Sequence, residues 1–202
     1  MSIIFGGDFF YNNGKEPVIA HEKLKMAIRE CTAFIVNLEG PVVDEPVVIR
    51  KFGPIKHQSE YAINILNSMG VTAVALANNH IMDSSRKGIE GTVGILNESN
   101  IEFFGLEDSL VSLEKPLIHL DIDGKAISII GVAEEEFNGP SAFGCGALII
   151  DPIVLWTLVT RELQKEREVI VVLHGGVEYE HLPPHGYERF VIGLSILALL
   201  PL

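Results

Sequence analysis

The stretch VTAVALANNHIMD, residues 71–83, places a dense group of polar side chains directly after a short apolar run. The run itself, Ala73–Ala77, has the length and composition of a buried β-strand. Asn78, Asn79 and His80 follow it without a break. In open α/β sheets, ligands bind beyond the carboxyl ends of the strands. The stretch therefore predicts a buried strand with candidate ligands at its functional end.

Three more short apolar runs end in groups that can bind a cation. These endings are Gly6-Gly7-Asp8 after Ser2–Phe5, Asn37-Leu38-Glu39 after Ala33–Val36, and His174-Gly175-Gly176 after Val169–Leu173. One such ending is ordinary turn chemistry, because Asp and Asn are common in turns. Four at the same edge of a sheet indicate a functional site. Their carboxylate, amide and imidazole groups together suit Zn, Mn or Fe.

The order of the expected elements gives the fold class. Helical patterns lie near Ile19–Cys31, Ser59–Met69, Lys87–Ser99 and Pro152–Glu166, and further strands are expected at Glu102–Phe104, Leu117–Asp121 and Ala126–Gly131. Asp123-Gly124, between the last two strands, is typical of a hairpin, so one strand pair should be antiparallel. The remaining order, β-α-β-α, predicts an α/β fold with mostly parallel sheets flanked by helices. We expect a single domain over residues 1–202.

Composition narrows the classes of function. The formal net charge of −12 argues against a nucleic-acid partner, because phosphate backbones are bound by clustered Lys and Arg. An acidic balance suits a protein that holds divalent cations, although solubility alone explains many acidic chains. Two widely separated cysteines are typical of reduced thiols in a cytosolic protein. The first residues carry no signal-peptide pattern, so we expect a cytoplasmic location.

The apolar stretch FVIGLSILALLPL, residues 190–202, is atypical for the rest of the chain. It has 13 residues, which is too short to span a bilayer, since a spanning helix takes about 20. It suits a final core helix or a contact with a second subunit in a homo-oligomer.

The motifs resemble the bacterial capsule synthesis family CapA, which is linked to poly-γ-glutamate synthesis. That family is similar in fold to the calcineurin-like metallophosphoesterases. The matching segments end near residue 187 and are GGD (6–8), NLEGPV (37–42), ALANNHIMD (75–83), GIEGTVGILNESNIEFFG (88–105) and VVLHGGVEYEHLPP (171–184). The resemblance implies the α/β/β/α sandwich of that superfamily, incomplete here at the C-terminus.

The resemblance also implies a role for each matching residue. The implied metal ligands are Asp8, Glu39, Asn79 and His174, with Asn37 assisting Glu39. His80 matches the imidazole that stabilises the transition state or protonates the leaving oxygen. Asp83, three residues further on, is placed to orient His80, which is our own inference. The implied cofactor is a divalent metal (Mn, Zn, Fe or Mg), which activates water and neutralises phosphoryl oxygens.

Two departures from the family pattern limit this expectation. Metallophosphoesterases often begin with Asp-x-His, but Phe10 stands where that histidine would be. The family also ends its site with a Gly-His-x-His segment, and nothing like it follows Tyr187. One metal position would keep Glu39, Asn79 and His174, and the other only Asp8 and Glu39. Three protein ligands are common in catalytic sites, so we expect at most one firmly bound metal.

Two functions of different classes stay open. The first is an enzyme that hydrolyses or transfers a phosphate ester or related anionic bond in a small molecule or polymer. The second is a non-catalytic binding or assembly protein that keeps the fold and part of the metal site. The missing C-terminal histidines favour the second function for this chain. The acid, amide and imidazole groups through His174 favour the first for full-length relatives.

Several other features have ordinary structural interpretations. The long loop Gly40–Gln58 contains three prolines, and loops of that length are often functional or mobile. The acidic run Glu134–Glu136 is typical of a solvated loop. Trp156 lies in a helix whose apolar spacing predicts core packing. His181 lies near the expected cleft but fits no motif.

Overall fold

A computed structural model of the chain describes residues 2–11, 21–47, 49–108, 115–140, 144–177 and 180. The strands are β1 (Ile3–Phe9), β2 (Ala33–Leu38), β3 (Ala73–Ala75), β4 (Glu102–Phe104), β5 (Leu106–Asp108), β6 (Leu117–Ile122), β7 (Lys125–Ala133), β8 (Cys145–Ala147) and β9 (Glu168–His174). The helices are α1 (Glu22–Glu30), α2 (Tyr61–Met69), α3 (Ser85–Glu98) and α4 (Pro152–Leu163). Among these described residues, no helix has the length and apolar character needed to cross a membrane.

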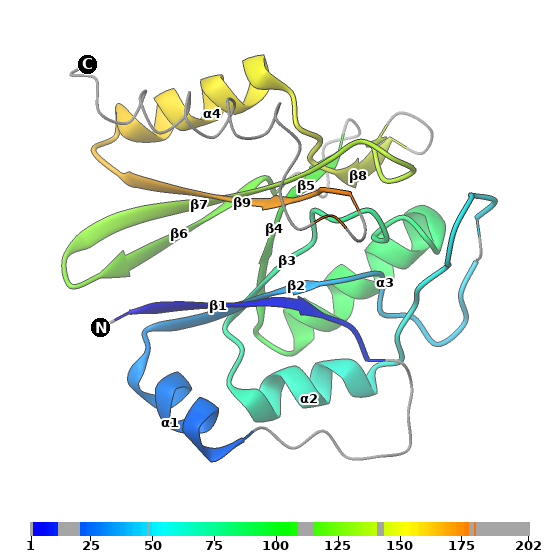
Figure 1. Cartoon of the computed structure of the whole chain (residues 1–202), viewed down its shortest axis with the longest axis horizontal. Helices are drawn as coiled ribbons and strands as arrows, with labels where there is room; N and C mark the ends of the chain where they lie inside the picture. Colours follow the sequence, from blue (N-terminus) through cyan, green and yellow to red (C-terminus); the bar gives the residue numbers. More distant parts are fainter. Residues whose placement is uncertain are drawn as a thin grey trace.

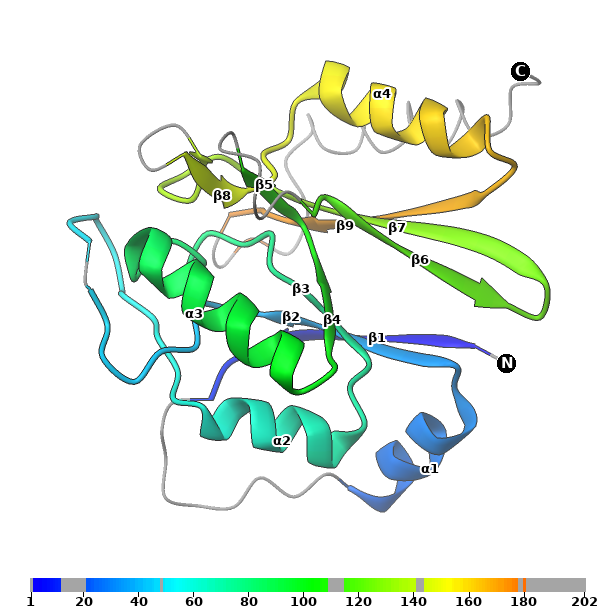
Figure 2. The same cartoon turned by 180° about the vertical axis from the view of Figure 1, so that it is seen from behind.

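The first sheet is parallel, with strand order β1-β2-β3-β4. A helix connects each strand to the next, and such crossovers are right-handed in nearly all proteins. Because the strands also follow one another in order, α1, α2 and α3 lie on the same face of the sheet (Figures 1 and 2). Leu66 of α2 and Ile89 and Leu96 of α3 are fully buried in the core against that face. The other face is left free for a second layer.

The second sheet is mixed, with strand order β6-β7-β9. β6 and β7 pair antiparallel, whereas β7 and β9 pair parallel. Asp123 and Gly124 join β6 to β7 with φ angles of 55° and 78°, as a tight hairpin turn requires. The antiparallel pair predicted from these two residues is confirmed. β5 and β8 form a separate antiparallel pair.

The two sheets pack face to face between layers of helices. Ile35 and Phe104 of the first sheet share a buried cluster with Ile129 of the second. On the outer face of the second sheet, Leu155 of α4 packs with Ile130. Figure 1 shows the resulting order of layers: helices, sheet, sheet, helix. The predicted α/β fold, with a parallel sheet flanked by helices, is confirmed in this four-layer form.

Helix α4 begins as the sequence indicates but presents a different face than expected. The Asp151 carboxylate accepts hydrogen bonds from the backbone N–H groups of Ile153 (2.8 Å) and Val154 (3.0 Å). The predicted core packing of Trp156 is wrong, because this side chain is 49% exposed. Apolar residues surround most of this helix, so their spacing alone does not show which face meets the sheet. In the structure, the face that carries Leu155 is buried.

Gly105 allows a close approach between the chain that leaves β4 and the chain that leaves β3 in the first sheet. It has a φ of 91° between β4 and β5, and a Cβ there would lie 2.7 Å from the Cβ of Ala77. We expect Gly105→Ala to lower the free energy of unfolding by about 2 kcal/mol, measured by urea denaturation. Gly124→Ala is the matched control, because Gly124 also has a positive φ but nothing lies within 4 Å of its Cβ position. Equal losses in the two variants would contradict a role for the Ala77 contact.

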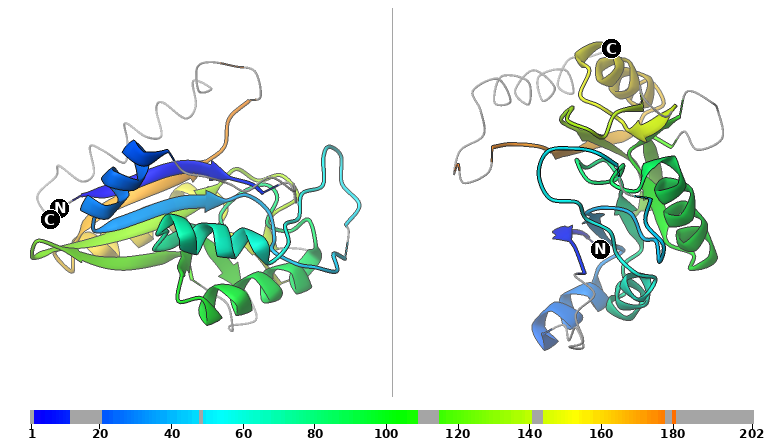
Figure 3. Two further views of the ribbon diagram at one scale, coloured as in Figure 1. Left: turned by 90° about the horizontal axis from the view of Figure 1, so that it is seen from below. Right: turned by 90° about the vertical axis from the view of Figure 1, so that its right-hand side faces the viewer.

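The carboxyl ends of the parallel strands lie at one edge of the molecule. β1 is longer than predicted and runs to Phe9, so Asp8 lies inside the strand and pairs with Asn37 of β2. An irregularity between Phe5 and Asp8 shifts the register there, and such bulges often adjust the direction of a side chain beside a functional site. The loop that connects β2 to α2 projects beyond this edge, as Figure 3 shows in cyan.

Candidate functional site

A cavity of about 630 Å³ opens at this edge. Five of the seven predicted site residues line it, namely Asp8, Glu39, Asn79, His80 and His174. The other two, Asn37 and Asp83, are buried behind its wall, at 8% and 0% exposure. The elements that bring the five together are β1, the end of β2, the turn after β3, and the end of β9. The convergence of these strand ends was the central expectation from the sequence.

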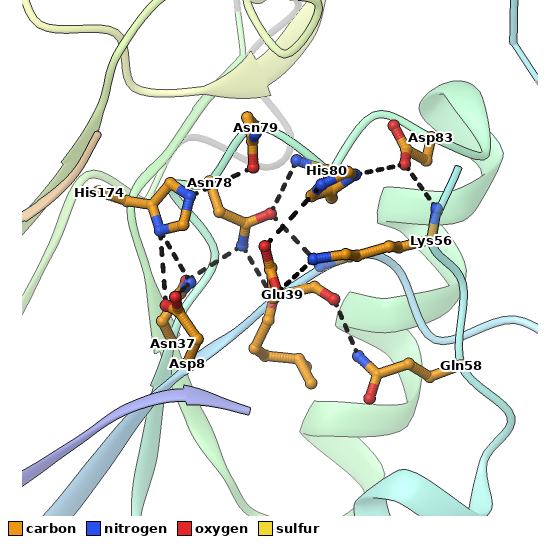
Figure 4. Close-up of polar contacts among 12 residues, drawn as sticks. Asp8, Asn37, Glu39, Lys56, Gln58, Asn78, Asn79, His80, Asp83 and His174 are labelled. Atoms are coloured by element: carbon orange, nitrogen blue, oxygen red, sulfur yellow. Dashed lines mark hydrogen bonds and ion pairs between the residues drawn. The ribbon is translucent and has the colours of Figure 1, made fainter. Parts of the chain in front are cut away.

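One half of the site is a continuous set of contacts around His174 (Figure 4). Nδ1 of His174 lies 3.1 Å from Nδ2 of Asn37 and 3.5 Å from Oδ1 of Asp8. Nε2 of the same ring lies 3.2 Å from Oδ1 of Asn79. The two ring nitrogens therefore face different partners. Contacts at one nitrogen can fix the orientation of the ring while the other nitrogen binds a ligand.

The Asp8 carboxylate is stabilised in its charged form. Its hydrogen bond with His174 lowers the pKa of Asp8 below the usual value for an aspartate, and the Asn37 amide, which donates at 2.7 Å, lowers it further. Partial burial acts in the opposite direction but does not prevail. Asp8 is thus an anionic group at neutral pH, as a cation ligand must be.

Asn78 fixes the geometry of the turn after β3. Its Nδ2 donates to the Asn37 side-chain oxygen (3.1 Å) and to the Leu38 carbonyl (2.9 Å). Its Oδ1 accepts from the backbone N–H groups of Gly40 (3.3 Å) and His80 (3.1 Å). Because Asn78 takes the Asn37 oxygen, Asn37 presents its amino group to Asp8 and His174. This arrangement suits a supporting role for Asn37, and its role as a ligand stays a prediction.

The other half of the site centres on His80. Nδ1 of His80 lies 2.7 Å from Oδ2 of Asp83 and 3.0 Å from Nζ of Lys51. The other Asp83 oxygen pairs with Nζ of Lys51 at 2.5 Å, and both side chains are almost fully buried, at 1% and 3% exposure. Nε2 of His80 is left to face the cavity, 3.8 Å from Oε1 of Glu39. Asp83 contacts the ring from the position expected, and its role in orienting His80 stays a prediction.

Four residues at the site were not identified from the sequence. Lys51 and Lys56 come from the loop after β2, and Lys56 Nζ lies 2.6 Å from Oε2 of Glu39. Glu134 and Glu136 also line the cavity. Glu136 accepts from the Asn79 amide at 3.3 Å, and Glu134 accepts from the Gly176 backbone at 3.2 Å. The unusual length of the loop Gly40–Gln58 indicated that it could carry site residues such as the two lysines. The acidic run Glu134–Glu136 gave no such signal, because it has the pattern of an ordinary solvated loop.

The sequence matches a known bacterial family over almost its whole length. The profile of the family described as "Bacterial capsule synthesis protein PGA_cap" matches residues 2–194. The chain belongs to this family. It is 28% identical over 151 residues to the PGA biosynthesis protein CapA of Bacillus subtilis (strain 168). It is 24% identical over 156 residues to the capsule biosynthesis protein CapA of Bacillus anthracis. The matches cover 73% of this chain but only 40% and 38% of those relatives.

Solved structures agree on the fold of this PGA_cap chain. A hypothetical protein of Thermus thermophilus superposes with a TM-score of 0.54 at 18% identity, covering 96% of this chain and 64% of that one. The NAD nucleotidase NadN of Haemophilus influenzae gives a TM-score of 0.51 at 15% identity, with coverages of 77% and 28%. A 5'-nucleotidase precursor of Thermus thermophilus gives 0.50 at 16%, with coverages of 76% and 30%. These neighbours share the metallophosphoesterase-like fold, and at such identities they show the fold alone.

Two candidate ligands in this PGA_cap chain are spaced as the ligands of one divalent cation would be. Nε2 of His174 and Oδ1 of Asn79 are 3.2 Å apart, and two ligands of one ion at about 2.1 Å lie about 3.0–3.4 Å apart. Within the described ranges, no group of three His, Cys, Asp or Glu side chains is close enough to hold an ion. A centre here therefore depends on the Asn79 amide oxygen. That Asp8, Glu39, Asn79 and His174 share one cation stays a prediction.

Lys51 compensates the buried charge of Asp83. We expect Lys51→Met to lower the free energy of unfolding by about 2 kcal/mol in urea. That is less than the 3–5 kcal/mol typical of broken buried pairs, since Asp83 keeps its bonds to His80 and to the Lys56 backbone. Lys125→Met is the matched control, because Lys125 and Glu168 pair at 2.7 Å with side chains 65% and 59% exposed. A loss no larger than the control's would show that the buried pair is not needed.

Proposed function

We propose that this PGA_cap chain hydrolyses or transfers a phosphate ester or a related anionic bond, with one divalent cation, in capsule or poly-γ-glutamate synthesis. The observation that carries the proposal is the arrangement of His80. Its Nδ1 is held by buried Asp83, and its Nε2 opens into the cavity that Asn79, His174, Glu39 and Asp8 also line. A proton donor beside candidate metal ligands is the combination that phosphate-ester cleavage needs.

Asn79, His174 and one carboxylate, Glu39 or Asp8, would hold the cation (Mn, Zn, Fe or Mg). When bound, it would supply positive charge to phosphoryl oxygens and acidify water near neutral pH. The cavity wall is rich in acidic side chains, namely Asp8, Glu39 and three further glutamates at 134, 136 and 180. Lys51, which also lines the wall, pairs with Asp83. An anionic substrate therefore gains from an added cation.

His80 would act as the general acid. Asp83, whose Oδ2 lies 2.7 Å from Nδ1, would keep a proton on that nitrogen and fix the plane of the ring, so that Nε2 faces the cavity where the leaving oxygen would lie. A protonated Nε2 gives its proton to that oxygen as the ester bond breaks, which prevents the build-up of an alkoxide. Lys51 pairs with Asp83 and so helps to keep the carboxylate in position.

The alternative is a binding or assembly protein that keeps the fold without turnover. Two features support this alternative. Phe10 stands where a histidine ligand is expected, and a metal centre here would depend on the Asn79 amide oxygen. The chain spans about two fifths of the length of the curated relatives it matches, so the activity and partners of a whole relative are proposals here. A phosphate-containing or polyanionic partner, a cytoplasmic location and the absence of nucleic-acid binding stay predictions. The region expected to form a homo-oligomer contact, residues 190–202, lies outside the described residues, as does His181.

Two measurements separate the two functions. The metal content of the purified protein is measured after dialysis against Mn or Zn, and hydrolysis of an aryl phosphate is assayed with the same ions. The enzyme is expected to bind one equivalent and to release phosphate in a metal-dependent way. Metal binding without hydrolysis of aryl or alkyl phosphates would favour the binding protein. No binding of either ion at millimolar supply would end the metal-dependent proposal.

A further inference from the structure

The two oxygens of the Glu39 carboxylate have different partners. Oε2 lies 2.6 Å from Nζ of Lys56, whereas Oε1 lies 3.8 Å from Nε2 of His80 (Figure 4). The backbone of Glu39 is fixed on both sides, because its N–H donates to the Phe9 carbonyl (3.0 Å) and its carbonyl accepts from Gln58 Nε2 (3.3 Å). The carboxylate is thus held with one oxygen toward a lysine and the other toward the cavity.

Lys56 is held in place by two contacts and by a close approach to Gly40, which a free surface lysine would lack. Its backbone N–H donates to Oδ2 of Asp83 at 2.7 Å. Its ammonium lies 5.3 Å from the centre of the Phe10 ring, within the range of a cation–π interaction. Gly40, with a φ of 94°, leaves room for this approach, because a Cβ there would lie 3.2 Å from the Cβ of Lys56. The side chain is accordingly only 24% exposed.

Phe10 links the position of Lys56 to the family pattern of metal ligands. It stands where metallophosphoesterases often have the histidine of Asp-x-His, and here its ring faces an ammonium group. We propose that the ammonium of Lys56 takes the place of a second metal ion, so that the centre combines one divalent cation with one lysine. The inference rests on the proposed metal-dependent function and specifies how many cations that site takes.

The charges around Glu39 support this stoichiometry. A carboxylate that bridges two metal ions uses one oxygen for each ion, but Lys56 occupies Oε2. A second divalent cation would have to displace the ammonium or lie beside it, and like charges at about 4 Å repel strongly at the effective dielectric constant of a protein. Of the residues that match the family pattern for this second position, only Asp8 would remain as a ligand, since the Phe10 side chain has no ligand atom. One cation and one ammonium still place positive charge on both sides of Glu39.

Manganese titration of the metal-stripped protein tests the inference. Calorimetry gives the affinity, and elemental analysis after dialysis gives the number of ions bound. We expect one Mn²⁺ per chain in the wild type and in Lys56→Arg, which keeps the charge. In Lys56→Met we expect the first ion to bind about tenfold more tightly, because Glu39 is released and a nearby positive charge is lost. A second, weaker ion should also become detectable.

Lys125→Met is the matched control, because it removes the same charge from an exposed lysine–glutamate pair of similar length. It should bind Mn²⁺ like the wild type, which separates a local effect from the net charge of an acidic chain. Thermal unfolding verifies that each variant folds. Two ions in the wild type, or unchanged binding in Lys56→Met, would overturn the role of Lys56 while leaving metal-dependent function intact. No Mn²⁺ binding by the wild type would overturn both.

Discussion

His80→Ala should lower the turnover of an alkyl phosphate by about 10²–10⁴-fold at saturating metal, the usual contribution of a positioned general acid. The expectation follows from the geometry of the ring, whose Nδ1 is held by Asp83 at 2.7 Å while Nε2 faces the cavity. Asn79 and His174 are untouched by the change, so the bound metal measured after dialysis should be the same as in the wild type.

The leaving group gives this experiment a sharper form. A 4-nitrophenolate leaves without much help, whereas an alkoxide needs a proton as the ester bond breaks. The loss in His80→Ala should therefore be several-fold smaller for 4-nitrophenyl phosphate than for an alkyl phosphate. An equal loss for both substrates would mean that His80 stabilises charge rather than donating a proton. His21→Ala is the control, because His21 lies at the exposed start of α1. Unchanged turnover in His80→Ala would remove the residue from the mechanism.

The positions of the candidate ligands could be predicted because they depend on strand ends. Parallel strands deliver their carboxyl ends to one edge of a sheet, so the runs that end in Asp8, Glu39 and Asn79 bring those residues together in the first sheet. His174 ends β9 of the second sheet and reaches them because the two sheets pack face to face. The hairpin at Asp123 was equally local, since two turn residues select the connection. The fold class follows from such local signals.

The parts that the sequence did not reveal depend on contacts distant in the chain. Lys51 and Lys56 come from a loop with no period of its own, and only the three-dimensional path of that loop brings them to Asp83 and Glu39. The short strands β5 and β8 have three residues each, which is too few to show an alternating pattern. Trp156 was misplaced because an apolar helix does not reveal which of its faces meets a sheet.

Glu162→Gln should lower the free energy of unfolding by about 3 kcal/mol at neutral pH, the lower end of the cost of breaking a buried ion pair. Glu162 is fully buried between α4 and the second sheet. Its carboxylate accepts from Lys165 (2.9 Å), His119 (2.8 Å) and Ser128 (3.0 Å). A glutamine keeps the shape but removes the charge that these donors surround, and one of them would then face an amino group.

The pH dependence of stability isolates the charge of Glu162. Burial alone would raise the pKa of Glu162, but the hydrogen bonds from Lys165, His119 and Ser128 lower it from 4.5 to about 2. A lowered pKa stabilises the fold fully above the unfolded-state value, and this stabilisation is lost as the pH falls from about 4.5 toward 2. Between pH 6 and pH 3 the free energy of unfolding of the wild type should therefore fall by about 2 kcal/mol more than that of Glu162→Gln.

Glu166→Gln, an exposed change nearby in the chain, is the control and should follow the wild type. If wild type and Glu162→Gln lose stability in parallel over this range in urea titrations, the charge of Glu162 does not hold α4 on the sheet, and only its shape does.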